Sequence, residues 1–231
     1  MNFGALQGNI GFILRGFLGL FPKDIWLPIL QGKARGLWWK RNSGVDGYWL
    51  GSYEYKTQRL FSSLIKDNYV VYDVGAHAGF YTLVAEKSAK NVRVFSYEPE
   101  PTNCANLKEH IKVNNLNAVA FNLALGNKMG DAKLKSAENS STYRVSDEGI
   151  NIRIAKLDEV LFAPPDIIKV DVEGGEYEFL LGAKETLKKY HPKLFIEIIN
   201  KNTFDLLKGL GYELTKISDT EYYGKNTRTS Y

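Results

Sequence analysis

Apolar runs alternate with amphipathic stretches over the last three-quarters of the chain. Short and nearly continuous apolar runs are typical of strands that helices cover on both faces. They predict strands at 69–74, 92–97, 118–124, 166–171 and 193–199. Between and before them, helical spacing predicts helices at 53–67, 79–89, 101–114, 176–189 and 200–209. This alternation indicates an α/β domain built on a mostly parallel, doubly wound sheet.

Two regions depart from this alternation. Residues 125–160 contain short alternating runs of apolar and polar residues, which predict a small β-excursion in place of a crossover helix. The stretch GYELTKISDTEYYGK, which follows residue 209, predicts a terminal hairpin that gives the sheet an antiparallel edge. We expect a partly helical N-terminal extension over 1–50 and one α/β domain over 51–231.

Composition is ordinary for a globular protein, with 44% hydrophobic and 24% charged residues among 231. The net charge of +4 is uneven, because residues 1–41 hold six Lys/Arg and one acid, whereas the remainder holds 24 basic and 25 acidic residues. A neutral domain offers no extended basic face to phosphates, so we expect no nucleic-acid partner. The single cysteine, Cys104, forms no disulfide within the chain, and a cytoplasmic location is the natural expectation.

The N-terminal quarter is both basic and aromatic. Its most apolar stretch, NIGFILRGFLGLF at 9–21, is too short to span a bilayer and is interrupted by Arg15. No basic leader precedes it, so we do not interpret it as a signal peptide. Two interpretations stay open: a helix that packs on the domain or on another subunit of an oligomer, and a helix that lies on a membrane surface. All four tryptophans also fall early, at Trp26, Trp38, Trp39 and Trp49.

A glycine-containing turn follows the first strand of the domain. In YDVGAHAGFYT (72–82), Gly75 and Gly79 are spaced G-x-x-x-G, unlike the G-x-G-x-x-G of a dinucleotide site. Glycines allow the backbone to approach a ligand closely, and the following helix offers unpaired N–H groups. Asp73 opens this turn, and its acidic side chain suits a cation or an ammonium group better than a phosphate.

An acidic residue lies at the tip of the second strand. Glu98 follows Gly75 by 23 residues, at the position where an acid accepts hydrogen bonds from the two ribose hydroxyls of a nucleoside cofactor. NAD and S-adenosylmethionine (SAM) sites share this acid. The missing middle glycine favours SAM, whose tail carries an ammonium and a carboxylate instead of a pyrophosphate. In the structural alternative, the glycines only make a tight turn and Glu98 is a solvated strand end.

Three further acids lie where the fourth and fifth strands end. Asp171 and Glu173 are two apart, so in an extended segment their side chains point the same way and either share a cation or act as a general base. Glu197 interrupts the apolar run LFIEII, where an unpaired charge is costly, and it is either functional or a paired structural acid. We assign no metal ligand, although a magnesium or calcium site formed by these three carboxylates stays open.

These motifs together resemble the FkbM family of SAM-dependent methyltransferases. The similar segments run from about Tyr53 to Tyr212 and include VVYDVGAHAGFYTLVAEK, YEPEPTNCANLKEHIKVN, NLALGNKMGD, AKLDEV, IIKVDVEGGEYEFLLGAKETL and PKLFIEI. The piece IKVDVEGGE is the most diagnostic of the family. The resemblance implies a Rossmann-like class I methyltransferase fold and methyl transfer to an oxygen of a sugar or natural product. His77 replaces the usual Asn of the family.

The resemblance also assigns cofactor contacts residue by residue. To the methionine part of SAM it assigns Asp73, Gly75, Ala76, His77 and Gly79. To the ribose it assigns Glu98, flanked by Pro99, and to the adenine it assigns Asn122 and Ala124. We expect two residues of the family-like GSYE segment to close over the cofactor, namely Tyr53 and Glu54.

The resulting expectation is an O-methyltransferase that acts on a glycan or glycosylated small molecule. Asp171, Glu173 and Glu197 are its candidate catalytic residues, and we expect residues 1–50 and 138–150 to shape the acceptor pocket. The basic, apolar N-terminus leaves a lipid or peptide acceptor as an alternative, together with a peripheral membrane contact. A SAM-binding module without catalysis is a further alternative, which the Asp171 and Glu173 pair disfavours.

Overall fold

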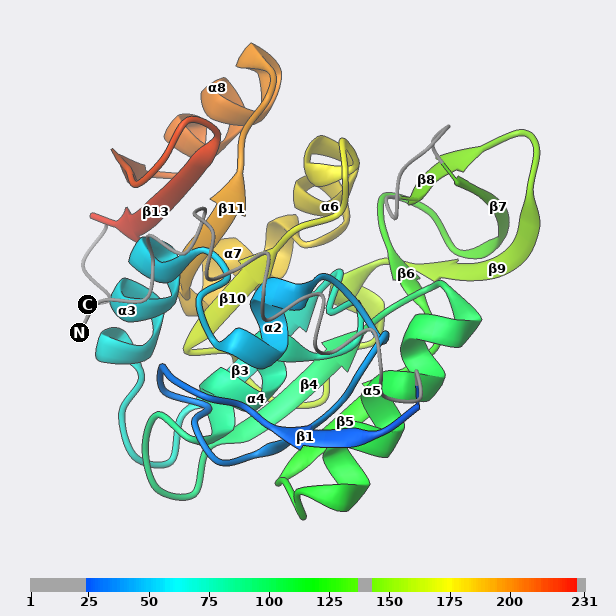
Figure 1. Ribbon diagram of the computed structural model, residues 1–231. Helices are drawn as coiled ribbons and strands as arrows, with labels where there is room; N and C mark the ends of the chain where they lie inside the picture. The colour runs from blue at the N-terminus through cyan, green and yellow to red at the C-terminus, as the bar shows by residue number, and fades with distance from the viewer. Residues whose placement is uncertain (1–23, 137–142, 228–231) are drawn as a thin grey trace.

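A seven-stranded sheet forms the centre of the described part of the chain (Figure 1). The computed structural model describes residues 24–136 and 143–227. Its sheet runs in the order β12 (Tyr212–Lys216), β13 (Glu221–Asn226), β11 (Lys193–Glu197), β10 (Ile167–Val170), β3 (Val70–Val74), β4 (Arg93–Tyr97) and β5 (Ala118–Phe121). The five strands from β11 to β5 pair in parallel, which confirms the predicted parallel sheet.

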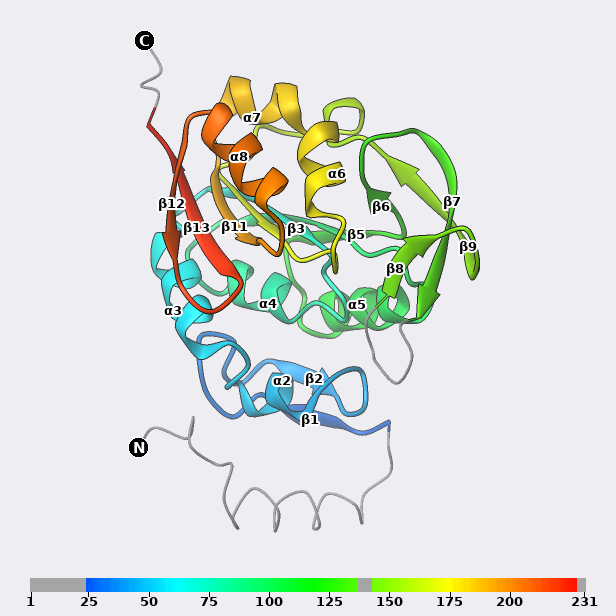
Figure 2. The same ribbon diagram turned by 90° about the horizontal axis from the view of Figure 1, so that it is seen from above.

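Helices cover both faces of this sheet, as Figure 2 shows. One face carries α3 (Tyr55–Leu64), α4 (Phe80–Glu86) and α5 (Pro101–Val113). The other face carries α6 (Glu176–Gly182), α7 (Lys184–Tyr190) and α8 (Lys201–Gly209). Because successive side chains of a strand point to opposite faces, Val71 joins the core beneath α4, whereas Tyr72 joins the core beneath α6. This arrangement is the predicted doubly wound fold.

Two predicted elements are interrupted where the chain passes to a second sheet. The strand expected at 118–124 is two strands, β5 and β6 (Ala124–Leu125), and the helix expected at 176–189 is α6 followed by α7. The end of α6 faces the loop after β6, because a Cβ on Gly182 would lie 1.8 Å from the Gly126 carbonyl oxygen. Such a close approach of two backbone segments requires glycine. Helix α6 therefore ends beside the loop that follows β6.

The predicted β-excursion is present as this second sheet. Its strands run in the order β6, β9 (Ile150–Ala155), β7 (Gly130–Ser136) and β8 (Tyr143–Ser146). A small core of Ala124, Leu134, Ile152 and Ile154 holds it together. Figure 2 shows it at one end of the molecule, beside β5.

The terminal hairpin is also present, with β12 paired antiparallel to β13. Strand β13 lies between β11 and β12 and is antiparallel to both, so the antiparallel strand is second from the edge. Helix α8 crosses over the sheet before β12, which therefore runs parallel to β11 at the edge. This insertion brings Glu221 of β13 directly opposite Glu197 of β11.

The described part of the N-terminal extension is a hairpin and a short helix. Strand β1 (Trp26–Pro28) pairs antiparallel with β2 (Trp38–Lys40), and α2 (Asp46–Leu50) follows. The apolar stretch 9–21 lies outside the described residues, and among those described no helix is long and apolar enough to cross a membrane. The domain boundary near residue 50 stays a prediction.

This hairpin covers the outer side of α4. The rings of Trp39 and Tyr48 lie 6.2 and 5.2 Å from the ring of Phe80, centroid to centroid. Helix α4 is therefore enclosed between the sheet and residues 29–49, and its residues 80–85 are all buried. A helix that is buried on every side is largely apolar, which accounts for the sequence FYTLVA, and the hydroxyl of Thr82 donates a hydrogen bond to Asp73.

His110 of α5 fastens the hairpin to the domain. Its imidazole stacks on Trp39 at 4.0 Å, its Nε2 accepts a hydrogen bond from the Lys40 N–H at 2.9 Å, and its Nδ1 lies 2.8 Å from the Ala78 carbonyl oxygen. Acceptance at Nε2 and donation from Nδ1 require the neutral ring. Burial lowers the pKa of His110 to about 4, although the Ala78 carbonyl and the Glu109 carboxylate act in the opposite direction.

We therefore predict that acid weakens the fold through His110. Between pH 6.5 and 4, the unfolded state binds a proton at this residue and the folded state does not, so the free energy of unfolding decreases as the pH falls. The contribution is about 2 kcal/mol between pH 7 and pH 5. Glu98 acts in the opposite direction over this interval but does so in both proteins, so urea unfolding at both pH values should show a change about 2 kcal/mol more unfavourable in the parent than in the His110→Asn variant. Equal changes in both proteins would contradict the prediction.

Candidate functional site

Two cavities open at the carboxyl ends of the central strands, where ligands bind in open α/β sheets. The larger, about 640 Å³, lies between the turn after β3, the end of β4 and the second sheet. The smaller, about 320 Å³, lies between the start of α3, the ends of β10 and β11, and β13. Tyr53, Asp171 and Glu173 line both cavities, so the two spaces meet at these side chains.

The turn after β3 depends on Gly75. Its φ is +78°, and a Cβ at this position would lie 1.8 Å from the carbonyl oxygen of Asp171. Glycine thus permits the turn to press against the end of β10, while the Gly75 N–H donates to the Tyr97 carbonyl oxygen at 2.9 Å. The carboxyl ends of β3, β4 and β10 are joined in this way beside the larger cavity.

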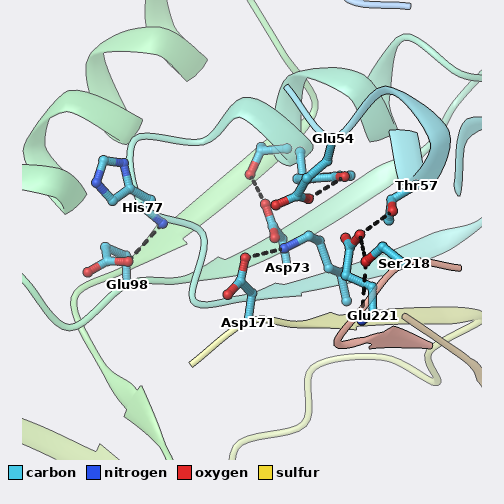
Figure 3. Close-up of polar contacts among 11 residues, drawn as sticks. Glu54, Thr57, Asp73, His77, Glu98, Asp171, Ser218 and Glu221 are labelled. Carbon is cyan, nitrogen blue, oxygen red and sulfur yellow. Dashed lines mark hydrogen bonds and ion pairs between the residues drawn. The ribbon is translucent and has the colours of Figure 1, made fainter. Parts of the chain in front are cut away.

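Glu98 lies at the end of β4 and lines the larger cavity, as the ribose assignment requires. Its Oε2 accepts a hydrogen bond from the His77 N–H at 2.8 Å (Figure 3). Its Oε1 accepts a hydrogen bond from the Glu100 N–H, also at 2.8 Å. Burial raises the pKa of Glu98 to about 7, although these hydrogen bonds lower it. Each carboxylate oxygen has a second lone pair, so Glu98 can still accept hydrogen bonds from hydroxyl groups.

His77 also lines the larger cavity. Its φ is +50°, a left-handed conformation in which Asn, Asp and His are enriched, which accounts for both the usual Asn of the family and this His. Its Nδ1 is buried and has no hydrogen-bond partner among the described residues. Burial lowers the pKa of His77 against the opposing effect of Asp171 and Glu100, so the ring is neutral near pH 7.

The sequence reasoning missed Lys169, which lies beneath the junction of the cavities. Its side chain is buried in β10 and its Nζ donates to Asp171 Oδ2 at 2.9 Å. The ammonium also lies 4.3 Å from the centre of the Tyr81 ring. Burial lowers the pKa of Lys169, but the carboxylates of Asp171, Glu54 and Asp73 together outweigh it and raise that pKa. A lysine inside the apolar run IIKV was the signal that could have identified it.

Asp73 lies beside Lys169, because the two residues are direct neighbours in the parallel pairing of β3 with β10. Asp73 is 1% exposed, accepts from Thr82 Oγ1 at 2.7 Å and lines neither cavity. The sequence predicts a cation or an ammonium group near Asp73. In the structure, the cation next to Asp73 is the ammonium of Lys169. Burial raises the pKa of Asp73, and Lys169 counteracts this.

The paired geometry expected for Asp171 and Glu173 is not what the fold provides. Glu173 has φ +51° and Gly174 has φ +93°, so the chain turns after Asp171 instead of continuing as a strand. The i, i+2 rule for extended chains therefore does not apply, and Asp171 is instead on the same side as Lys169. Both acids nevertheless reach the junction of the cavities. Glu197 lines only the smaller of the two cavities.

The remaining predicted cofactor residues divide between the cavity walls and their support. Residues Pro99 and Ala124 line the larger cavity, and Glu54 lines the smaller one, where it accepts from Tyr81 Oη at 2.8 Å. Three residues line neither cavity: Ala76, Gly79 and Asn122. Asn122 supports the wall, because its Nδ2 donates to the carbonyl oxygens of Glu98 and Pro99 at 3.0 and 2.8 Å.

The residues of the larger cavity fit SAM. The Glu98 carboxylate suits ribose hydroxyls, and the buried, unpartnered His77 Nδ1 offers a polar contact within the same cavity. Gly174 lines it too, and no atom lies within 4 Å of the place where its Cβ would be. A volume of about 640 Å³ falls within the usual range for cofactor sites. The individual contacts stay predictions.

Metal binding has no support from the part of the chain that the structure describes. No three His, Cys, Asp or Glu side chains within 24–136 and 143–227 come together as a ligand set. Sharing of a magnesium or calcium ion by Asp171, Glu173 and Glu197 thus stays a prediction. Activity measured after EDTA treatment and after restoring magnesium would test it.

Comparison with known proteins identifies the family to which this chain is similar. The family model described as the methyltransferase FkbM domain matches residues 73–214. The hexuronic acid methyltransferase AglP of Haloferax volcanii is 26% identical over 175 residues, which cover 71% of this chain and 72% of AglP.

The chain is also similar to solved structures. The methyltransferase FkbM from Methylobacillus flagellatus is 17% identical with a TM-score of 0.49, over 78% of this chain and 55% of that one. This chain therefore spans about half the length of that protein. The tRNA (uracil-54, C5)-methyltransferase of Pyrococcus abyssi, in complex with S-adenosyl-L-homocysteine, is 14% identical with a TM-score of 0.52, over 88% of this chain and 44% of that one.

We predict that Glu98→Gln weakens SAM binding about tenfold or more at pH 8, because a charged hydrogen-bond acceptor is lost. The pKa of Glu98 is about 7, so the carboxylate gains a proton as the pH falls, and SAM affinity of the parent should drop roughly tenfold from pH 8 to pH 6. Isothermal titration calorimetry measures both effects.

Two controls accompany this measurement. Glu109→Gln changes an exposed acid of α5 that pairs with Lys40, and it should bind SAM like the parent. Glu98→Gln should also show less pH dependence than the parent. Parent-like SAM affinity in the Glu98→Gln variant would refute the ribose assignment.

Proposed function

Because the chain belongs to the FkbM family of SAM-dependent methyltransferases, we propose that it transfers a methyl group to a hydroxyl of a sugar or of a glycosylated small molecule. The supporting observation is the junction of the two cavities. The larger cavity suits the cofactor, the smaller one suits the acceptor, and the Asp171 carboxylate lies where the two meet.

SAM, when bound, supplies an electrophilic methyl group. A sugar hydroxyl is weakly acidic, so its oxygen needs a group that removes the proton. We assign this role to Asp171, which takes the hydroxyl proton on its carboxylate. Lys169 holds the carboxylate through Oδ2 at 2.9 Å, and it leaves Oδ1 for the acceptor. Lys169 is thus a positioning residue, while Glu173 lines the same junction.

The rest of the small cavity suits a polar ring. Glu54 and Glu197 line it with carboxylates that accept hydrogen bonds from hydroxyl groups, and Tyr53, Phe195 and Tyr222 add aromatic surface. Sugars present both hydroxyl groups and apolar C–H faces, so this mixture fits them. The relative that is named a hexuronic acid methyltransferase also supports a glycan-type acceptor.

The alternative acceptors and the membrane contact depend on segments that lie wholly or partly outside the described residues. A lipid or peptide acceptor and a peripheral membrane contact depend on residues 1–23, which lie outside the described residues. Of the segment 138–150 that we expect to shape the acceptor pocket, residues 138–142 are likewise outside them, and Val145 lines the larger cavity. Exchange of 1–50 or 138–150 with another family member should change acceptor choice, and unchanged specificity would refute this assignment.

We predict that Asp171→Asn lowers kcat by about 10²–10⁴-fold, which is the usual contribution of a general base. SAM affinity should change far less, because the proposed role of Asp171 concerns the acceptor. A SAM-consumption screen over sugars, lipid-linked glycans and hydroxylated compounds supplies the acceptor, and NMR locates the new methyl group.

The matched control is Asp205→Asn, which replaces an exposed acid of α8 away from both cavities. It should leave kcat unchanged. If Asp171→Asn kept parental kcat, the general base would have to be another group. If the parent bound SAM but methylated no acceptor in the screen, the alternative of a non-catalytic SAM-binding module would be favoured.

A further inference from the structure

The smaller cavity is strongly acidic. Five carboxylates line it, from Glu54, Asp171, Glu173, Glu197 and Glu221, whereas Lys169 is the one basic residue among its described lining residues. Lys169 is 5% exposed and its ammonium pairs with Asp171. Its charge acts on Asp171, Glu54 and the neighbouring Asp73, and it forms no ion pair with Glu197 or Glu221 on the far wall.

That far wall is formed by two glutamates that face each other. Glu197 and Glu221 are directly opposite in the antiparallel pairing of β11 with β13, an arrangement in which like charges repel. No Lys, Arg or His within the described residues forms an ion pair with either.

Hydroxyl groups hold this wall in place. Glu221 Oε2 accepts hydrogen bonds from Thr57 Oγ1 at 2.7 Å and from Ser218 Oγ at 2.6 Å (Figure 3). These contacts fix the Glu221 carboxylate on a strand that pairs directly with the Glu197 strand. The repulsion between them is relieved by a ligand that brings hydrogen-bond donors or positive charge, and it is increased by a ligand that brings a carboxylate.

We propose that the smaller cavity selects a sugar that is neutral or carries an amino group, and rejects a uronic acid. Glu197 is the specificity-determining residue, because it faces the cavity without a basic partner. This inference rests on the proposed function, since it identifies the acceptor of the same site. The preferred acceptor then differs from the hexuronic acid in the name of the archaeal relative.

Saturation-transfer NMR on the full chain with S-adenosylhomocysteine tests this without turnover. The probes are the methyl glycosides of glucose, glucosamine and glucuronic acid, which differ in charge on one ring. In the parent, the glucuronide should bind at least tenfold more weakly than the glucosaminide, with the glucoside between them or equal to the glucosaminide. Glucuronide binding as tight as that of the glucoside would overturn the proposal, as would binding of none of the three.

Variants at position 197 separate specificity from structure. Glu197→Gln should reduce the discrimination several-fold and Glu197→Lys should reverse it, while Glu213→Gln, an exposed acid of β12 outside both cavities, should leave it unchanged. A purely structural role for Glu197 predicts a changed melting temperature in Glu197→Gln with the parental binding order, and this result would refute the proposal. SAM titration checks that each variant is folded.

Methyl-transfer assays with the same glycosides distinguish a failure of the proposed function from a failure of the charge selection. Turnover of the glucuronide at the rate of the glucoside or faster leaves the proposed function intact and refutes the charge selection. The expected binding order without turnover of any sugar supports the charge selection and refutes methyl transfer to these acceptors.

Discussion

A buried ammonium group determines how the centre of this protein is built. Lys169 lies in a central strand with Asp73 beside it on β3, Asp171 two residues along and the Tyr81 ring of α4 above. A charge at this depth is tolerated only when it is paired. The carboxylates that act on it come from β3, the residue before α3 and the end of β10, so these elements and helix α4 have to keep one fixed arrangement. Asp171, which pairs with Lys169, lines both cavities.

The same arrangement explains the division of the site into two chambers. Gly75 lets the turn after β3 approach the Asp171 carbonyl, and Lys169 holds the Asp171 side chain. Asp171 is therefore fixed through both its backbone and its carboxylate, and with Tyr53 and Glu173 it forms the boundary between the larger and the smaller cavity. A proton acceptor at such a boundary is of use only if it does not move, because proton transfer requires the acceptor hydroxyl within hydrogen-bond distance.

The N-terminal hairpin contributes to this rigidity from outside. It covers α4, whose Tyr81 contacts Lys169, and its contact with α5 runs through the neutral ring of His110. Tyr48, from α2, lines the larger cavity and stacks on Phe80. Residues that the sequence suggested as a separate extension thus share the core of the domain and reach its site. A change in this segment acts on the site through α4 as well as through direct contacts.

The sequence by itself determined the features that depend on neighbouring residues. Apolar periodicity specified the parallel strands, and the spacing of a few residues specified the glycine turn after β3 and the acid at the end of β4. The sequence did not specify features whose partners are far apart in the chain. The pairing of Lys169 with Asp73 and the opposition of Glu197 to Glu221 follow from strand order and register. Only the tertiary structure decides these, because strand order is set by how the helices pack over the whole sheet.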